Sequence, residues 1–294
     1  MTGVAHAEAI GGLLEAGGFV RRPASWVATS GACFYKIPRR SDDCAADLAD
    51  ARAVADARSE FEQAALLAAH DAAVNRPCAR ERACLVYPLI EGDDLRDRLR
   101  RGSHDDDGRI LLEEAVSLCG RLHRIEPEAL ERIPSHDYRI DPFAPAPEAV
   151  MRRLRQRATR LVVRGFEARN FRMDAARGRL VFFDPHERGR GMPEEDFTRF
   201  VLSLLMIGWG RGGRPSAWTA FDLDALRVAY ERASGEALDP ELERYAFDLN
   251  VRMRRTHARN AIAAMPRGPT RLAATAYAWF HFRQIDAWRR RHGL

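Results

Sequence analysis

The sequence has no long apolar run and few cysteines, and each absence excludes a class of protein. The longest apolar stretch, between Phe200 and Gly210, falls well short of the roughly 20 residues that a membrane-spanning helix needs. The N-terminal segment has no basic region, and Glu15 interrupts its apolar residues, so we expect no signal peptide. The five cysteines are scattered and lack CxxC spacing, which disfavours a disulfide framework or a zinc site and indicates a reducing cytoplasm.

Several catalytic motifs are also missing, including GxxxxGK[ST], HExxH and GxSxG. The segment Gly208–Gly213 matches GxGxxG, but Pro215 follows it and the preceding run is rich in Leu and Met. This pattern favours a helix that ends in a glycine loop over a dinucleotide site. We expect His281 to be a packed core histidine. The aromatic cluster near it should pack in a terminal helix rather than stack on bases; its members are Trp279, Phe280, Phe282 and Trp288.

Length and charge allow a two-lobed protein with anionic ligands. A chain of 294 residues suits two packed lobes better than one core. Its 47 Lys+Arg against 42 Asp+Glu give a net charge of +5, which suits nucleotides or phosphorylated substrates but gives no clear nucleic-acid signal. The basic clusters Arg152–Arg160, Arg252–Arg259 and Arg289–Arg291 lie in helix-like segments, so they are either solvated helix faces or a surface for an acidic partner.

The order of expected elements predicts an α+β fold. Short strands and one long helix, Asp47–His70, occupy residues 1–90, whereas the chain from Asp94 onward is mostly helical around one β-hairpin. The expected strands before the helical part cover residues 26–28, 32–37 and 84–88. We therefore predict a small β-rich N-lobe over residues 1–90 and a large helical C-lobe over residues 91–294, which would carry the hairpin.

The hairpin is flanked by two oxygen-bearing side chains. Asn170 precedes its first strand and Asp184 follows its second, fourteen positions later. Because a hairpin brings its ends together, the amide and the carboxylate should converge. Oxygen ligands of this kind suit Mg²⁺. Taken alone, the pattern favours an Asn and an Asp that cap an ordinary hairpin.

Three segments around this hairpin resemble the protein-kinase-like superfamily, and more closely its aminoglycoside phosphotransferase and choline kinase branch. Leu161–Asn170 resembles the catalytic loop, Leu180–Glu187 the metal-binding end of the hairpin, and Asp196–Val201 a helix start whose Asp accepts backbone hydrogen bonds from the catalytic loop. The resemblance implies a two-lobed kinase-like fold that uses ATP and Mg²⁺, with Asn170 and Asp184 as metal ligands.

The N-terminal half matches the same family in order and type. Phe34-Tyr35-Lys36 resembles the strand whose lysine contacts the α- and β-phosphates. Ser59–Leu67 resembles the helix whose glutamate pairs with that lysine, which makes Glu60 the expected partner of Lys36 and Glu62 the alternative.

The family's hinge has a clear counterpart in this sequence, and its phosphate loop has a weak one. Leu85–Gly92 resembles the hinge that holds adenine, which implies nucleotide contacts from Val86, Tyr87 and Leu89. A glycine-rich phosphate loop is weak: between Phe19 and Phe34 there is only Gly31, with Ser25, Thr29 and Ser30 nearby.

One departure from the family concerns catalysis itself. The position of the catalytic aspartate holds Gly165, and Val163 stands where a histidine is usual. In the family that aspartate orients the acceptor hydroxyl and takes its proton. Glu167 is the nearest carboxylate that could substitute, and His186 and Glu187 are alternatives.

Three functions follow from this pattern. The leading hypothesis is an ATP- and Mg²⁺-dependent phosphotransferase that acts on a small-molecule hydroxyl, with an arginine-rich C-lobe that hints at an anionic acceptor. The alternative is a catalytically impaired pseudokinase that serves as a nucleotide-responsive binding or regulatory module. A third is transfer of another group, such as AMP.

Overall fold

The computed structural model describes residues 3–100, 106–125, 133–163, 165–185, 188–207 and 221–294. The chain forms two compact units. The first unit comprises residues 1–92 and 172–186, and the second comprises residues 93–171 and 187–294. No helix in the described ranges combines the length and the apolar character needed to cross a membrane. The glycine-rich segment Gly208–Gly213 lies outside the described residues.

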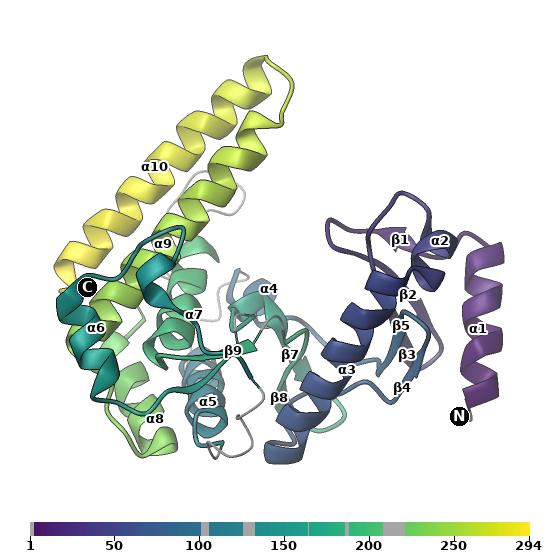
Figure 1. The fold of residues 1–294 in the computed structure, drawn as a ribbon, viewed down its shortest axis with the longest axis horizontal. Coiled ribbons are helices and arrows are strands. Elements are labelled where there is room, and N and C mark those ends of the chain that lie inside the picture. The colour runs from purple at the N-terminus through teal and green to yellow at the C-terminus, as the bar shows by residue number, and fades with distance from the viewer. Residues whose placement is uncertain (1–2, 101–105, 126–132, 164, 186–187, 208–220) are drawn as a thin grey trace. The chain divides into compact units, whose positions relative to one another are not determined.

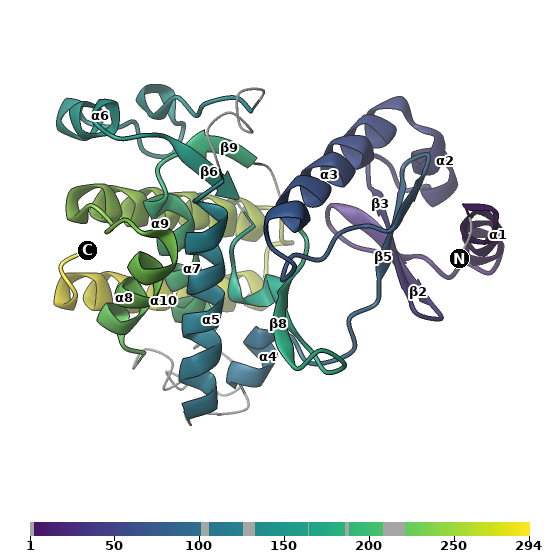
Figure 2. The ribbon, with the colours of Figure 1, turned by 90° about the horizontal axis from the view of Figure 1, so that it is seen from below.

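The first unit is built on an antiparallel sheet in the order β1-β2-β3-β5-β4. Its strands are β1 (Val20–Arg21), β2 (Ser25–Ser30), β3 (Cys33–Pro38), β4 (Ala79–Glu81) and β5 (Cys84–Pro88). Helix α1 (Gly3–Glu15) lies on one face of the sheet, and α3 (Ala51–His70) lies on the other (Figures 1 and 2). Because side chains alternate along a strand, successive residues of β3 and β5 face these two helices in turn.

The expected helix Asp47–His70 is in fact two helices, α2 (Cys44–Ala49) and α3. Asp50 separates them because its backbone is extended, with φ −64° and ψ 129°. Its carboxylate accepts hydrogen bonds from the backbone N–H groups of Arg52 and Ala53, both at 2.9 Å, and so caps α3. An alanine-rich pattern without Gly or Pro conceals such a break, since Asp is also tolerated within helices.

The hairpin of β7 (Phe171–Asp174) and β8 (Arg179–Phe182) differs from the prediction in its unit. From Arg172 onward it belongs to the first unit, whereas we expected it in the C-lobe. Backbone hydrogen bonds explain this: the Phe182 N–H donates to the Ala73 carbonyl, and the Asn75 N–H donates to the Phe182 carbonyl, both at 2.8 Å. These bonds tie β8 to the segment that follows α3.

The second unit is mostly helical. Its helices are α4 (Leu95–Arg100), α5 (Asp106–Leu122), η2 (Tyr138–Ile140), α6 (Glu148–Arg155), η3 (Ala168–Asn170), α7 (Glu194–Ile207), α8 (Leu223–Ser234), α9 (Pro240–Ala263) and α10 (Pro269–Arg291). Strands β6 (Arg160–Val163) and β9 (Arg188–Gly191) form an antiparallel ribbon. Gly120 allows α5 to approach α8, because a Cβ there would lie 2.8 Å from the carbonyl oxygen of Tyr230.

Helices α9 and α10 run antiparallel as a long helical hairpin (Figure 1). Trp288 of α10 is buried and stacks on Phe247 of α9, with ring centroids 5.9 Å apart. The packing expected for the aromatic cluster is confirmed for Trp288 and is wrong for Trp279 and Phe280, because these two side chains are exposed. The histidine prediction is confirmed: His281 is buried, and burial lowers its pKa to about 4.

Candidate functional site

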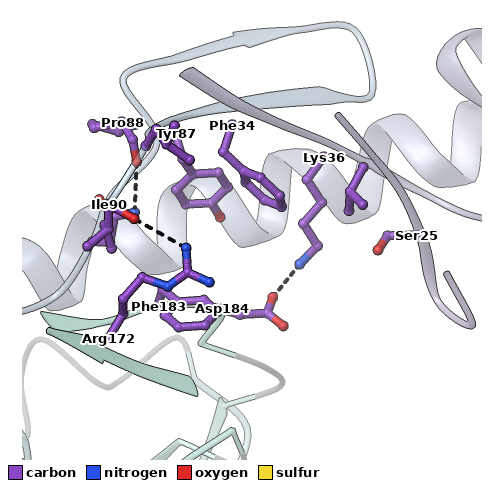
Figure 3. Close-up of a pocket in the computed structure, with 12 residues that line it drawn as sticks. Ser25, Phe34, Lys36, Tyr87, Pro88, Ile90, Arg172, Phe183 and Asp184 are labelled. Carbon is purple, nitrogen blue, oxygen red and sulfur yellow. Dashed lines mark hydrogen bonds and ion pairs between the residues drawn. The ribbon is translucent and has the colours of Figure 1, made fainter. Parts of the chain in front are cut away.

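A pocket lies within the first unit, between the sheet and the hairpin (Figure 3). Apolar side chains dominate its lining, and a small number of charged groups converge at one side. The lining residues are Ser25, Val27, Phe34, Lys36, Asn75, Tyr87, Pro88, Leu89, Ile90, Arg172, Phe183 and Asp184. Alternation accounts for the sheet residues, since Val27 pairs with Lys36 and Phe34 pairs with Tyr87 across neighbouring strands, so all four side chains share one face.

The charged group at the centre is Lys36. Its Nζ donates to Glu60 Oε1 at 2.9 Å and to Oε2 at 3.0 Å, and it also donates to Asp184 Oδ1. The Lys36 side chain is 13% exposed. Burial alone would lower the pKa of Lys36, but the carboxylates of Asp184 and Glu60 outweigh it and raise that pKa. Lys36 is therefore a fixed, fully charged ammonium group inside the pocket.

The sequence left two glutamates open as the partner of Lys36, and the structure places Glu60 there. Glu62 instead pairs with Arg58 on the exposed side of α3, at 2.9 Å. Tyr87 adds a third contact, because its hydroxyl donates to Glu60 Oε1 at 2.6 Å. Burial and the adjacent Glu60 carboxylate raise the pKa of Tyr87, which keeps the hydroxyl protonated as a donor.

Asp184 has an unusual backbone. Its φ is +57°, in the left-handed region that residues other than glycine rarely adopt. Such conformations persist where surrounding contacts hold them, and they cluster at functional sites. Here the ion pair with Lys36 holds the carboxylate inside the pocket.

The three residues expected to contact the nucleotide from the hinge do not all line the pocket. Tyr87 and Leu89 line the pocket, and the Leu89 N–H donates to the Ala32 carbonyl at 2.9 Å. The side chain of Val86 lies on the opposite face of the sheet, in the core that includes Ile10 and Tyr35, and does not line the pocket. Strand alternation thus turns the Val86 side chain away from the pocket, and a nucleotide contact from Val86 stays a prediction.

Only one of the phosphate-loop candidates lines the pocket. Ser25 begins β2 and lines the pocket, directly after the short turn from β1. Thr29 and Ser30 end β2 and Gly31 lies in the turn to β3, and none of the three lines the pocket. Gly31 has φ +54°, so the tight β2–β3 turn explains this glycine without a phosphate.

Sequence reasoning missed Arg172 and Phe183. The guanidinium of Arg172 lies 5.5 Å from the ring centroid of Phe183, and its Nη1 donates to the Ile90 carbonyl at 3.2 Å (Figure 3). Both residues come from the hairpin. The signal that was available is position, since each lies within two residues of a candidate metal ligand, Asn170 or Asp184.

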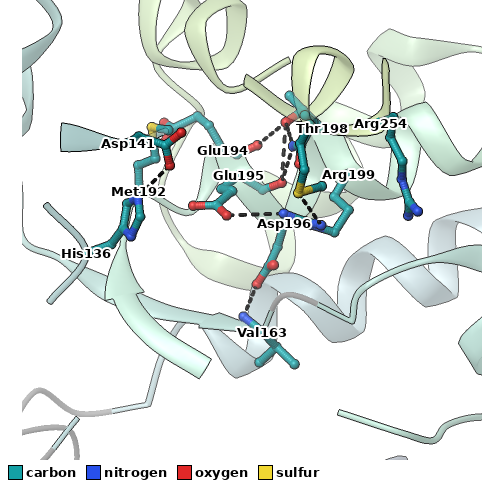
Figure 4. A network of polar contacts seen from close by, with 12 residues as sticks. His136, Asp141, Val163, Met192, Glu194, Glu195, Asp196, Thr198, Arg199 and Arg254 are labelled. Atoms are coloured by element: carbon teal, nitrogen blue, oxygen red, sulfur yellow. Dashed lines mark hydrogen bonds and ion pairs between the residues drawn. The ribbon is translucent and has the colours of Figure 1, made fainter. Parts of the chain in front are cut away.

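The catalytic-loop candidates lie in the second unit, after β6. Asp196 of α7 accepts a hydrogen bond from the Val163 N–H at 2.6 Å, the loop contact that the resemblance implied (Figure 4). His123 Nε2 lies 3.2 Å from the same carboxylate oxygen. Burial raises the pKa of Asp196, and the hydrogen bonds from His123 and Val163 act in the opposite direction. Asp196 thus anchors the start of the loop from inside the core.

Within this loop, Asn170 is buried and its Nδ2 donates to the Gly165 carbonyl at 2.7 Å. With the amide nitrogen engaged, Oδ1 is the atom that suits a metal. Gly165 lies in a turn and has no side chain to act as a base. Because Asn170 belongs to the second unit and Asp184 to the first, their convergence stays a prediction. The alternatives His186 and Glu187 lie outside the described residues.

Glu167 is buried and both of its carboxylate oxygens are engaged. Oε1 accepts from Arg254 Nη2, and Oε2 lies 2.9 Å from Arg169 Nε. Proton transfer to Glu167 would therefore disrupt one of two ion pairs. It lines a cavity of the second unit, and does not line the pocket around Lys36.

No protein-family model matches the chain, and no curated protein matches it. Solved structures do. A protein of Ralstonia eutropha JMP134 assigned as an aminoglycoside phosphotransferase aligns with a TM-score of 0.59 and 14% identity, over 90% of this chain and 88% of that chain. Amicoumacin kinase hAmiN, solved with AMP-PNP and Ca²⁺, aligns with a TM-score of 0.55 and 13% identity, over 88% and 85%.

Macrolide 2'-phosphotransferase type I aligns with a TM-score of 0.53 and 15% identity, over 95% of this chain and 98% of that chain. The α+β, two-lobed prediction is confirmed by these alignments, each of which covers most of both chains. At such identities the likeness is one of fold. The chain has the protein-kinase-like fold, in the form found in aminoglycoside phosphotransferases.

Proposed function

We propose that this protein is an ATP- and Mg²⁺-dependent phosphotransferase that acts on a hydroxyl of a small molecule. The observation that carries the proposal is the triad of Lys36, Glu60 and Asp184 at the side of an apolar pocket. Among structures of the same fold, amicoumacin kinase was solved with AMP-PNP and Ca²⁺, and APH(2")-IIa with streptomycin and ATP. A nucleotide and a small-molecule acceptor are the ligands that this support favours.

In this proposal the pocket of the first unit holds the nucleotide. The rings and aliphatic chains of Phe34, Val27 and Leu89 contact the base, and Lys36 binds the α- and β-phosphates. Glu60 fixes the direction of Lys36. Asp184 and, as the sequence predicts, Asn170 supply the carboxylate and amide oxygens that Mg²⁺ prefers. When bound, the metal neutralises charge that develops on the phosphates.

The transfer step needs little covalent chemistry from the protein. The acceptor hydroxyl oxygen forms a bond to the γ-phosphorus while the bond from that phosphorus to the β-phosphate oxygen breaks, so ADP leaves and the hydroxyl proton is released. Gly165 offers no base for that proton, and the Glu167 carboxylate is held by Arg254 and Arg169. General-base help is typically worth about 10²–10⁴ in rate. Water would accept the proton, and we expect slow turnover.

A second candidate function is a nucleotide-responsive module without turnover. Gly165 and the ion pairs of Glu167 favour it, because they leave the catalytic loop without an available carboxylate in the described residues. Both candidates bind nucleotide. They differ only in whether the phosphoryl group moves.

The first test is the melting temperature with and without MgATP. A ligand at 100 times its dissociation constant stabilises by about 2.7 kcal/mol, which raises the midpoint of a chain of this size by several degrees. Asp184→Asn should shrink this shift. Asp174→Asn, which alters a carboxylate at the turn of the same hairpin, should retain it relative to its own midpoint without ligand. No shift in the wild type would sink both candidates.

Gly165→Asp separates the two candidates, measured as ADP release from MgATP. For an impaired kinase we expect an increase of about 10²–10⁴ over wild type, because the variant supplies the missing base. A wild-type activity that the substitution abolishes would mean that the loop serves a different transfer, such as that of AMP.

A further inference from the structure

The second unit contains a cavity whose charge is unbalanced. It lies among α4, the catalytic loop and the C-terminal parts of α7 and α9. The cavity is lined by Arg96, Arg100, Glu167, Ala168, Arg169, Ser203, Met206, Ile207 and Arg254. The lining thus holds four arginines and one carboxylate. Asp94 and Asp97 pair with Arg96 and Arg100 from outside the lining, at 3.2 to 3.4 Å.

The cavity is held in shape by the residues that also shape the catalytic loop. Glu167 bridges Arg254 of α9 and Arg169 of the loop, so it fixes two of the four guanidinium groups. Ser203 of α7 accepts a hydrogen bond from the Ala168 N–H at 2.9 Å and donates to the Phe200 carbonyl at 2.7 Å. The arginines are therefore presented by packed elements rather than by isolated surface side chains.

Burial makes the excess charge costly. The Arg254 side chain is 19% exposed, and burial lowers its pKa from the usual value. Arginine stays charged in proteins, so the repulsion among clustered guanidinium groups is relieved by an anion and not by loss of a proton. The planar guanidinium fork binds phosphate and carboxylate in a bidentate manner.

We propose that this cavity binds an anionic group, a phosphate or a carboxylate, of the acceptor molecule. That this anion belongs to the acceptor rests on the proposed function, whereas the existence of the anion site does not. The cavity measures about 180 Å³, below the roughly 300–1,000 Å³ of sites that hold a whole drug-sized ligand. It suits one charged group, while the hydroxyl-bearing part extends along the catalytic loop that Ala168 and Arg169 share with Asn170. A polycationic aminoglycoside would be repelled here.

The test is calorimetric titration of the full chain with two probes, inorganic phosphate and citrate, at constant ionic strength. Both are titrated into wild type and into Lys36→Met, which removes the phosphate-binding cation of the first unit. We expect binding in both proteins. The double variant Arg100→Gln/Arg169→Gln should raise the dissociation constant at least tenfold. These two side chains are 44% and 49% exposed, so the variant should fold.

The matched control is Arg109→Gln/Arg252→Gln, which removes the same charge from two arginines of the second unit that are 59% and 56% exposed and lie outside the cavity. It should bind as wild type does. If wild type binds one probe more tightly than the other, the result supports the proposal and identifies the anionic group as a phosphate or a carboxylate.

Three results overturn the proposal: no binding of either anion, an equal loss in the control, or binding that disappears in Lys36→Met while circular dichroism shows that variant to be folded. Because no nucleotide is present, failure of the MgATP shift leaves this result intact, and the converse also holds.

Discussion

The two charged clusters of this protein differ in how their buried cations are compensated. In the first unit Lys36 is shared by the carboxylates of Glu60 and Asp184, and Arg172 donates from Nη1 to the Ile90 carbonyl. Two cations there meet two carboxylates. In the second unit, four arginines line a cavity with the single carboxylate of Glu167, and counting the Asp94 and Asp97 partners outside the lining, four cations meet three carboxylates.

The difference shows what each cluster needs. A balanced cluster stabilises itself, so the removal of one member leaves a partly buried charge without compensation. An unbalanced cluster is completed by a ligand, and its exposed members contribute little to stability on their own. Substitutions in the first unit should therefore act on folding, and those around the arginines should act on binding.

The largest expected effect follows from Lys36→Met. It leaves the Glu60 and Asp184 carboxylates together without their cation, and we expect a loss of about 3 kcal/mol in the free energy of unfolding. The MgATP-induced shift should disappear as well. Urea denaturation measures the first effect and a thermal melt the second. Arg169→Gln, the matching substitution in the other cluster, should lower the free energy of unfolding by under about 1 kcal/mol. An equal loss in both variants would contradict the proposed difference between the two clusters.

A second prediction concerns acid, and it acts on the second unit. Burial lowers the pKa of His281 to about 4, so folding favours its neutral form. That stability is present above the unfolded pKa of about 6.5 and is lost as pH falls toward 4, by about 3 kcal/mol. His281→Leu should lose that much less between pH 8 and pH 4 than wild type does, by urea denaturation at each pH. Parallel losses in the two proteins would contradict it.

The alkaline side should show the reverse for the first unit. The pKa of Lys36 is raised by its two carboxylates, so the stability that this charge contributes is present below about 10.5 and lost only as pH rises through the folded value. The acid sensitivity of His281 and the alkaline sensitivity of Lys36 thus report on different units.

The smaller effect in the first unit is expected from Tyr87→Phe, which removes the hydroxyl that donates to Glu60. A hydrogen bond to a charged group is worth about 1.5–3 kcal/mol; since Glu60 keeps Lys36, we expect about 1.5 kcal/mol, measured by urea denaturation. The lysine would be held less firmly, so MgATP should bind more weakly but still bind. An unchanged stability would show that the ion pair alone fixes Glu60.

Much of this could be anticipated from particular residues. The apolar strand around Lys36 predicted a cation that needs a carboxylate, and α3 supplied Glu60 at 2.9 Å. The hairpin was predicted from its turn, where Asp174 accepts from the Ala176 and Arg177 N–H groups and Gly178 has φ +61°. These are local features, and local sequence carries them.

Other features were missed because they depend on register or on distant packing. Val86 differs from Tyr87 only in which face of β5 it occupies, and a shift of one residue exchanges the two. Arg254 lies 87 positions from Glu167, and no local pattern links them. The break at Asp50 was hidden by the alanine-rich composition around it.

Residue type and short-range periodicity in the sequence predicted strands followed by helices around one hairpin. The family resemblance added Lys36 with either Glu60 or Glu62 as its partner, and Gly165 where the family has a catalytic aspartate. The tertiary structure alone decided that the hairpin joins the first unit, that Val86 faces away from the pocket, and that four arginines line one cavity with Glu167. A sequence gives the number of charged groups. Their interaction energies depend on which groups packing brings within a few ångströms of one another.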